Sequence, residues 1–181
     1  MSQSVIEDQL VEWDTESFRD VLRNLPVPVG ILTTADGTQR DGLTISSFNS
    51  VSLNPPLVSV SLTRNKPATD LTLQTGRFAI NFLASDSVAL ANHFAQSRGV
   101  PKFESVEAED GPGGLPTLAE AVAVLYARVR DVHEAGDHYL ITGEVFAGRV
   151  NGGVPLVRYL SQYTAPSVES RDSTDAGRAA G

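Results

Sequence analysis

The sequence predicts a mainly β protein, an antiparallel barrel with flanking helices. Segments in which apolar and polar residues alternate, such as Val58, Val60 and Leu62 with serines between them, are typical of strands buried on one face. Short turns rich in Gly, Asp, Asn and Pro join these segments, without a regular series of crossover helices. Hairpin connections of this kind indicate an antiparallel sheet rather than a doubly wound one. A length of 181 residues, 41% of them apolar, suits one domain with one core.

The first expected element is a helix over residues 14–25. Apolar residues from Phe18 to Leu25 recur at helical spacing and form one stripe. Asp14 is placed to cap the helix, and Trp13 and Phe18 to form a hydrophobic staple across its first turn. The proline that follows Leu25 ends the helix.

Two further helices are expected in the middle of the chain. The segment 65–76 has Pro67 at its start and Gly76 at its end, as helices often do. The other begins with Ser85 as its cap, runs through "DSVALANHFAQS" and stops at Gly99. Residues 100–117, which include "DGPGGLP", are expected to form a loop.

The expected strands alternate in hydrophobicity and are separated by turns. They lie at 27–31, from 43 to the turn at 54–56, and at 58–63, 77–83, 121–132, 139–150 and 155–163. Asp36-Gly37 predicts the first hairpin turn. In "SSFN" (46–49) the alternation changes phase, which predicts a bulge or a bend. We therefore expect an N-terminal extension at 1–13, one domain at 14–164 and a disordered tail at 165–181.

Composition excludes several classes of function. The net charge of −8 and the pI of about 4.8 argue against nucleic-acid binding, which needs a basic face. The absence of cysteine excludes disulfides, thiolate nucleophiles and cysteine-bound metals. Neither a signal peptide nor an apolar run of ~18 residues is present, so we expect a cytoplasmic protein without a membrane partner.

Familiar catalytic motifs are missing. The chain has no G-x-S-x-G elbow, no P-loop and no dinucleotide fingerprint after a strand. His93 lies within an expected helix, where a packing or surface role is the simpler interpretation. His133 and His138 flank a turn that contains Glu134 and Asp137, but this spacing is a weak metal signal. We expect no metal site, and by itself the turn favours an ordinary hairpin.

The stretch "GLTISSFNSVSLNPPLVSVSLTRNKPAT" (42–69) is more informative. Arg64, Lys66 and Thr69 surround the start of the helix at Pro67, where the first amides lack intrahelical partners, so an anion such as phosphate would fit. A solvated basic turn explains the same residues equally well. The many hydroxyls of this stretch could bond a planar heteroaromatic ring, or they could simply cover an exposed strand face.

Eight motifs in order resemble the flavin reductase-like, FMN-binding split-barrel family, the reductase components of two-component flavin monooxygenases. The resemblance covers about Phe18 to Tyr163. The matching segments are "FRDVLRNLPVPVGILTT", "GLTISSFNSVSLNPPLVSVSL", "NKPAT", "TGRFAINFLA", "LANHFA", "KFESV", "AGDHYLITGEV" and "PLVRYLSQY". It implies a Greek-key split β-barrel with flanking helices that forms a homodimer.

The resemblance also implies site residues. Flavin-binding residues would lie along two strands, in the basic turn and at two aromatic positions, namely Leu43, Thr44, Ile45, Ser46, Ser47, Ser61, Leu62, Thr63, Lys66, Thr69, Phe103 and Tyr163. His138, from the "GDH" motif, would be the catalytic residue near the nicotinamide. Two departures stand out. Leu160-Ser161 replaces an Arg-Gly pair common in the family, and Pro67-Ala68 replaces serines of the phosphate turn.

The function implied by the resemblance is NAD(P)H-dependent reduction of FMN or FAD, with reduced flavin passed by diffusion to a separate monooxygenase. Hydride transfer is the chemistry of the cofactors, which would explain why the chain lacks acid–base or nucleophile motifs. Two alternatives remain open at this point. The flavin could be a fixed prosthetic group that reduces an organic substrate, or the protein could bind flavin without being an enzyme.

Overall fold

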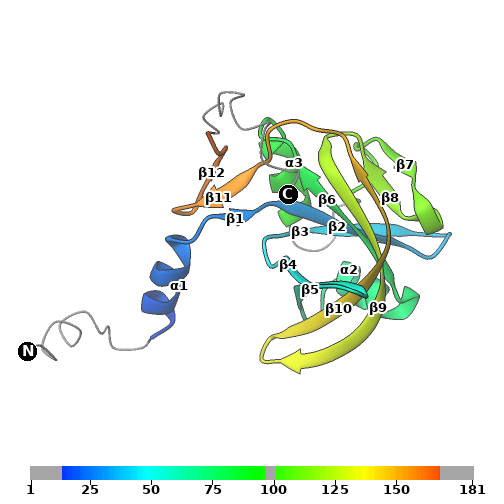
Figure 1. The fold of residues 1–181 in the computed structure, drawn as a ribbon, viewed down its shortest axis with the longest axis horizontal. Helices are drawn as coiled ribbons and strands as arrows, with labels where there is room; N and C mark the ends of the chain where they lie inside the picture. The colour runs from blue at the N-terminus through cyan, green and yellow to red at the C-terminus, as the bar shows by residue number, and fades with distance from the viewer. Residues whose placement is uncertain (1–13, 97–100, 168–181) are drawn as a thin grey trace, which may run out of the picture.

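The computed structural model describes residues 14–96 and 101–167, which form an antiparallel β structure with three α-helices among these residues (Figure 1). The largest sheet has the strand order β3-β2-β6-β9-β10-β5-β4. Its strands are β2 (Gly30–Ala35), β3 (Arg40–Ile45), β4 (Asn49–Leu53), β5 (Pro56–Thr63), β6 (Arg77–Leu83), β9 (Ala121–Ala135) and β10 (His138–Val150). All neighbours in this sheet are antiparallel, which confirms the mainly β, antiparallel prediction.

Two small sheets and the helices complete the fold. One small sheet contains β1 (Val27–Pro28), β11 (Val157–Tyr159) and β12 (Gln162–Thr164), and the other contains β7 (Ala108–Asp110) and β8 (Pro116–Leu118). The helices are α1 (Thr15–Arg23), α2 (Pro67–Thr75) and α3 (Val88–Ala95), with a short 3-10 turn at Pro112–Gly114. None of the described helices has the length and apolar character needed to cross a membrane.

The long hairpin of β9 and β10 bends the large sheet around its core (Figure 1). Register shifts in this pair, between Thr142 and Gly143 and between Val145 and Ala147, mark irregular pairing of the kind that bends a strand. The concave face covers an apolar cluster that includes the fully buried Phe78. Gly143 is needed there, because a Cβ at this position would lie 2.6 Å from the tip of the Phe78 ring.

Two helices pack on the body of the protein and one does not. Helix α2 buries Leu71 against the sheet, and α3 buries Phe94 in a second apolar cluster. Helix α1 buries none of its residues and extends from the body as an arm (Figure 1). Its N-cap is Asp14, whose side chain accepts a hydrogen bond from the Ser17 amide, as the sequence predicted.

Several sequence predictions need correction. Helix α3 begins after Ser87 rather than Ser85 and ends at Ala95; Gly99 lies outside the described residues. The expected loop 100–117 contains β7, the 3-10 turn and the start of β8. These strands escaped detection because three-residue segments show too little alternation. Trp13 and the end of the expected tail also lie outside the described residues.

The C-terminal segment 155–163 is two strands rather than one. Strand β11 pairs with β12 through a tight turn in which Leu160 and Ser161 both have positive φ values. Such values are uncommon for residues with a Cβ, so alternation alone gave no sign of the turn. The phase change at 46–49 does mark a bend, because β3 ends at Ile45 and β4 begins at Asn49.

We expect Gly143→Ala to lower the free energy of unfolding by about 1–3 kcal/mol, the usual cost of overpacking a core. The added methyl would clash with the Phe78 ring and with Ala127. Urea denaturation measures the change. Gly148→Ala in the same strand is the matched control, since its Cβ would meet neighbouring atoms at 3.3 Å or more. Equal effects of the two substitutions would show that the Phe78 contact does not require glycine.

Candidate functional site

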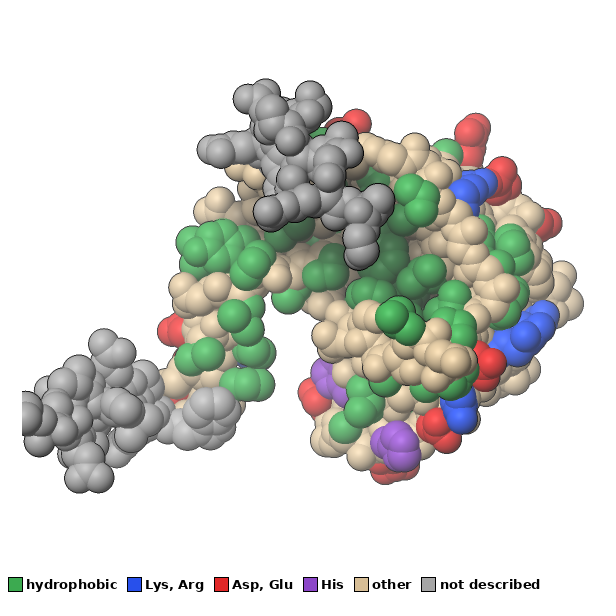
Figure 2. All heavy atoms as spheres, viewed as in Figure 1, with side chains coloured by type: hydrophobic (Ala, Val, Ile, Leu, Met, Phe, Trp, Pro, Cys, Tyr) green, Lys and Arg blue, Asp and Glu red, His purple; other side chains and the backbone are tan. Residues whose placement is uncertain are grey.

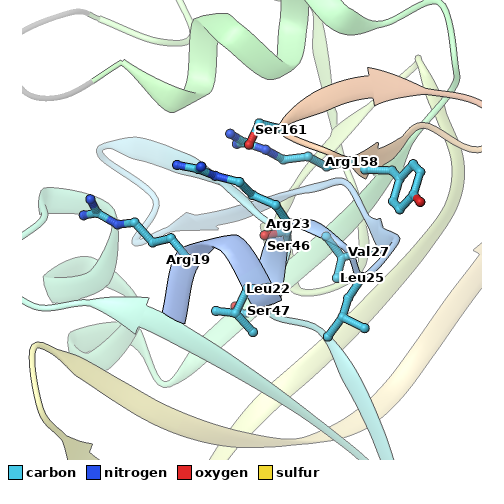
Figure 3. A pocket seen from close by; sticks show the side chains of 10 residues that line it. Arg19, Leu22, Arg23, Leu25, Val27, Ser46, Ser47, Arg158 and Ser161 are labelled. Atoms are coloured by element: carbon cyan, nitrogen blue, oxygen red, sulfur yellow. The ribbon is translucent and has the colours of Figure 1, made fainter. Parts of the chain in front are cut away.

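A groove of about 640 Å³ lies between the α1 arm and the body of the protein (Figure 3). One wall comes from α1 and the residues after it, and the other from the end of β3 and from the β11–β12 hairpin. The lining residues are Arg19, Leu22, Arg23, Leu25, Val27, Ser46, Ser47, Arg158, Tyr159 and Ser161. The volume is in the usual range for small-molecule sites. The groove therefore brings together Ser46 and Ser47, which the sequence predicted as site residues, and three arginines that it did not predict.

Ser47 holds the chain between β3 and β4 against β5. Its Oγ donates to the Ser61 carbonyl (2.9 Å) and accepts from the Ser61 amide (3.0 Å). Pairing between β4 and β5 runs only as far as Asn49 and Ser59, so Ser47 satisfies backbone groups that β4 does not reach. Ser46 is exposed and borders the groove, where its hydroxyl and the local backbone can meet a ligand.

The other expected residues of β3 and β5 differ in what they offer. The Thr44 hydroxyl donates to the Ala91 carbonyl (2.6 Å), which ties β3 to α3. Ile45 and Leu62 are 5% and 0% exposed, and both side chains belong to the central core. Leu43 also packs against that core. A cofactor could therefore contact Ile45 and Leu62 through their backbone atoms. The sequence pattern does not distinguish backbone contacts from side-chain contacts.

The basic turn follows directly after Thr63, the last residue of β5. Lys66 is the N-cap residue of α2 and Pro67 is its first residue. Thr69 is fully buried, and its hydroxyl donates to the Thr63 carbonyl (2.9 Å), so it braces the turn. Arg64 pairs with Glu134 (3.2 Å) and stacks on Tyr139. An anion at this turn would therefore meet Lys66 and the first-turn amides rather than Arg64 or the Thr69 hydroxyl.

His138 begins β10 beside Thr63. Its Nε2 lies 3.1 Å from the Thr63 hydroxyl and its Nδ1 lies 2.7 Å from Asp137 Oδ1. The hydrogen bond from His138 and, next, its charge lower the pKa of the Asp137 carboxyl below the usual 3.8. Because an ionised carboxylate only accepts, Nδ1 carries the proton, and in the neutral ring Nε2 accepts from Thr63. The imidazole is thus held in one orientation.

His138 and the Ser47–Ser61 contact lie along the same strand. Thr63, which touches His138, is two residues beyond Ser61 on β5, and two residues of strand span about 7 Å. The other histidines have different settings. His93 bonds the Lys102 carbonyl through a ring nitrogen (2.8 Å), and within the described residues no three His, Asp or Glu side chains are grouped as metal ligands would be.

The two aromatic candidates are separated. Phe103 packs edge-on against Phe94, with ring centroids 5.3 Å apart, in the second apolar cluster. Tyr163 packs at the edge of that cluster and also lines a small cavity of about 100 Å³ that Ser46 and Arg158 share. The structure therefore places Tyr163 beside Ser46, whereas Phe103 is tied to α3.

Sequence reasoning missed Arg158 and the arginines of α1. Arg158 lies opposite Tyr163 in the β11–β12 pair, so the predicted Tyr163 was the only signal pointing to it. Arg19 and Arg23 are four residues apart and face the groove (Figure 3). Their helical spacing was visible in the sequence, but only the position of α1 brings them near Ser46.

Substitution of His138 by alanine should raise the pKa of Asp137 toward 3.8, because the hydrogen bond and charge that lower it are lost. Asp137 stabilises the fold above its unfolded pKa, and this contribution disappears as the pH falls through the lowered folded value. NMR titration of side-chain carboxyl carbons measures the pKa of Asp137 in the wild-type protein and in the variant. Asp36 is the internal control: the amides of Gln39 and Thr38 lower its pKa to about 2, and it should not move. An unchanged Asp137 titration would contradict the assignment.

Comparisons with known proteins agree with this architecture. Residues 22–167 match the family described as "Flavin reductase like domain". An "NADPH-flavin oxidoreductase" of Streptomyces viridifaciens is 36% identical over 147 residues, covering 78% of this chain and 76% of the relative. The reductase component of a 4-nitrophenol 4-monooxygenase/4-nitrocatechol 2-monooxygenase of Rhodococcus opacus is 35% identical over 164 residues, covering 90% and 85%.

A solved structure extends the similarity to three dimensions. The NADH:FAD oxidoreductase SgcE6 of Streptomyces globisporus C-1027 superposes with a TM-score of 0.81 at 28% identity, covering 88% of this chain and 98% of that one. The family match covers far more than half of the chain and includes both residues of the Ser47–Ser61 contact. The chain therefore belongs to the flavin reductase-like family.

Proposed function

We propose that this protein is an NAD(P)H-dependent flavin reductase that supplies reduced flavin to a separate monooxygenase. The observation that carries the proposal is the hydroxyl-lined edge at Ser46 and Ser47, which opens into a groove of small-molecule size. Relatives named as flavin oxidoreductases and as monooxygenase reductase components support both halves of the proposal.

The residues present fit a flavin nucleotide. Ser46 is exposed at the groove, and Ser47 and Ser61 hold its backbone in place, so hydroxyl and amide groups can bond the polar edge of a ring. Lys66 and the start of α2, farther along β5, provide a cation and amides for a phosphate. A bound flavin supplies the hydride acceptor, which no side chain of the protein could provide.

His138 is proposed to orient the nicotinamide. Thr63 and Asp137 occupy its two ring nitrogens and fix the plane of the imidazole. A ring held in this way acts through position, which suits a hydride transfer that needs alignment rather than a proton donor. The donors near Ser46 would also stabilise the negative charge that develops on the cofactor.

We propose a homodimer in which α1 contacts the second copy. Helix α1 has nine residues and buries none of them, and so short a helix is marginal in water by itself. Val21 is 55% exposed and Leu22 is 46% exposed, and Figure 2 shows apolar side chains along this arm. A backbone bond from the Leu160 amide to the Arg23 carbonyl ties the arm to the β11–β12 turn. Contact with a second copy would bury the stripe.

A flavin reductase and an enzyme with a fixed prosthetic flavin are the two enzymatic alternatives, and flavin kinetics separate them. A reductase that releases its product should show rates that saturate with added free flavin. A protein with a fixed prosthetic flavin should be indifferent to added flavin and should need an organic substrate. The relatives named as reductase components favour the first class.

The test is oxidation of NADH and of NADPH, followed by absorbance, with FMN, FAD and riboflavin in turn. We expect turnover that saturates in at least one flavin, with FMN the first candidate. Purified protein that binds flavin but oxidises neither donor would exclude the enzyme and favour a flavin-binding protein.

In the same assay, His138→Ala should raise the KM for the nicotinamide donor by about 10-fold or more while changing flavin affinity much less. The reason is that the imidazole would contact the donor, and loss of one positioned contact weakens binding by about 10-fold. Flavin affinity is read by fluorescence quenching. Equal losses for donor and flavin would remove His138 from the donor site.

For the dimer, the double substitution Phe18→Glu/Val21→Glu should weaken self-association at least ~10-fold, because each buried apolar side chain contributes about 1.5–3 kcal/mol. Sedimentation equilibrium measures the dissociation constant. Asp20→Asn is the control, since Asp20 is exposed on the opposite face of the same helix from the stripe. A wild-type monomer, or a dimer unaffected by the double substitution, would contradict this role of α1.

A further inference from the structure

The groove beside Ser46 is cationic, although the protein as a whole is acidic. Arg19, Arg23 and Arg158 line it, and none of the described residues that line it is a carboxylate. The net charge of the chain is −8, so three arginines around one groove oppose the overall balance. A local cationic site in an acidic protein favours an anionic ligand there.

Arg158 differs from the other two arginines. Arg19 pairs with Glu16, and Arg23 pairs with Glu16 and Asp20, so the charges on α1 are largely compensated within the helix. Within the residues that the structure describes, the Arg158 side chain makes no ion pair or hydrogen bond. Its charge is therefore the one in this groove that remains available to a ligand.

The position of Arg158 is fixed by a small sheet. It pairs with Val27 of β1 on one side and with Tyr163 of β12 on the other. It lines both the large groove and the small cavity that contains Ser46 and Tyr163. Arg158 thus borders the space next to the proposed flavin edge, and Figure 3 shows it on the wall opposite α1.

We propose that Arg158 binds a phosphate group of a nucleotide that occupies this groove. The inference rests on the proposed function. A guanidinium presents a planar fork of donors that matches phosphate oxygens. Val27, which pairs with Arg158 in the small sheet, provides an apolar surface beside it, so the groove combines features that suit a base and a phosphate.

Two nucleotides of the reaction carry phosphate, and the geometry favours the nicotinamide donor. The turn at Lys66 follows the C-terminal end of β5, outside the residues that line the groove with Arg158, and already offers a cation and helix amides for the flavin phosphate. Arg158 lies in a separate small sheet and lines the groove together with Ser46 and Ser47. A second anion site, placed apart from the first, suits a second phosphorylated ligand.

The test compares Arg158→Ala, Arg158→Lys and the control Arg130→Ala. Arg130 is exposed on β9, away from the groove, with only distant carboxylates at 3.9 Å. We measure KM and kcat for NADH and NADPH, and KM for FMN and riboflavin. Arg158→Ala should raise the donor KM about 10- to 100-fold, as loss of a charged hydrogen bond does, with little change in kcat. Arg158→Lys should raise the donor KM less than Arg158→Ala does, and the donor KM of Arg130→Ala should stay within about twofold of the wild-type value.

The pattern of losses identifies the phosphate. Equal effects on NADH and NADPH point to the pyrophosphate, and a larger effect on NADPH points to its 2′-phosphate. A raised KM for FMN with an unchanged KM for riboflavin assigns Arg158 to the flavin phosphate instead. Unchanged values throughout, or equal losses for FMN and riboflavin with an unchanged donor, would overturn the proposal.

A binding measurement separates this inference from the proposed function. Calorimetric titration with NADP⁺ needs no turnover, so it can be read even if the wild-type protein reduces no flavin. Weaker binding by Arg158→Ala than by wild type supports the site, and equal binding overturns it. Wild-type turnover with no effect of Arg158→Ala would reject the inference and leave the reductase function intact.

Discussion

The candidate site depends on the paired hydrogen bonds between Ser47 and the backbone of Ser61. Pairing between β4 and β5 begins only at Asn49, so without Ser47 the amide and carbonyl of Ser61 would lack protein partners. The same bonds hold residues 46–48 across the gap between two strands at opposite edges of the sheet. Ser46 is exposed at the groove as a consequence, and the groove, the basic turn and His138 are all arranged along or beside β5.

The core beneath the site is what allows this arrangement to be rigid. Ile45, Leu62 and Ile80 are buried in one cluster, so the strands that carry the site cannot shift without opening the core. Gly143 lets the long β10 strand approach Phe78 closely, and β10 in turn positions His138 opposite Thr63. Packing and site geometry are therefore linked through β5 and β10.

The local charge at the candidate site differs from the net charge of the chain. The acidic balance of the chain is compatible with local cationic positions at Lys66, at the start of α2, and at Arg158, in the groove beside Ser46 and Ser47. Asp137 keeps its negative charge beside His138, since its pKa is lowered, and so orients the imidazole. These are short-range effects, which depend on which side chains meet, and the net charge conveys nothing about them.

Much of the fold was determined by local sequence patterns. Alternation located the long strands, and Pro67 with Gly76 located α2, because backbone preferences and one-sided burial act over a few residues. The short strands β7, β8, β11 and β12 were missed or merged, since they form only by pairing with distant segments. Tertiary structure alone decided that Arg64 is bound to Glu134 and that Arg158 joins Ser46 in one groove. The physical reason is that such contacts join residues far apart in the chain, and a sequence records what each residue is but not which distant residue it meets.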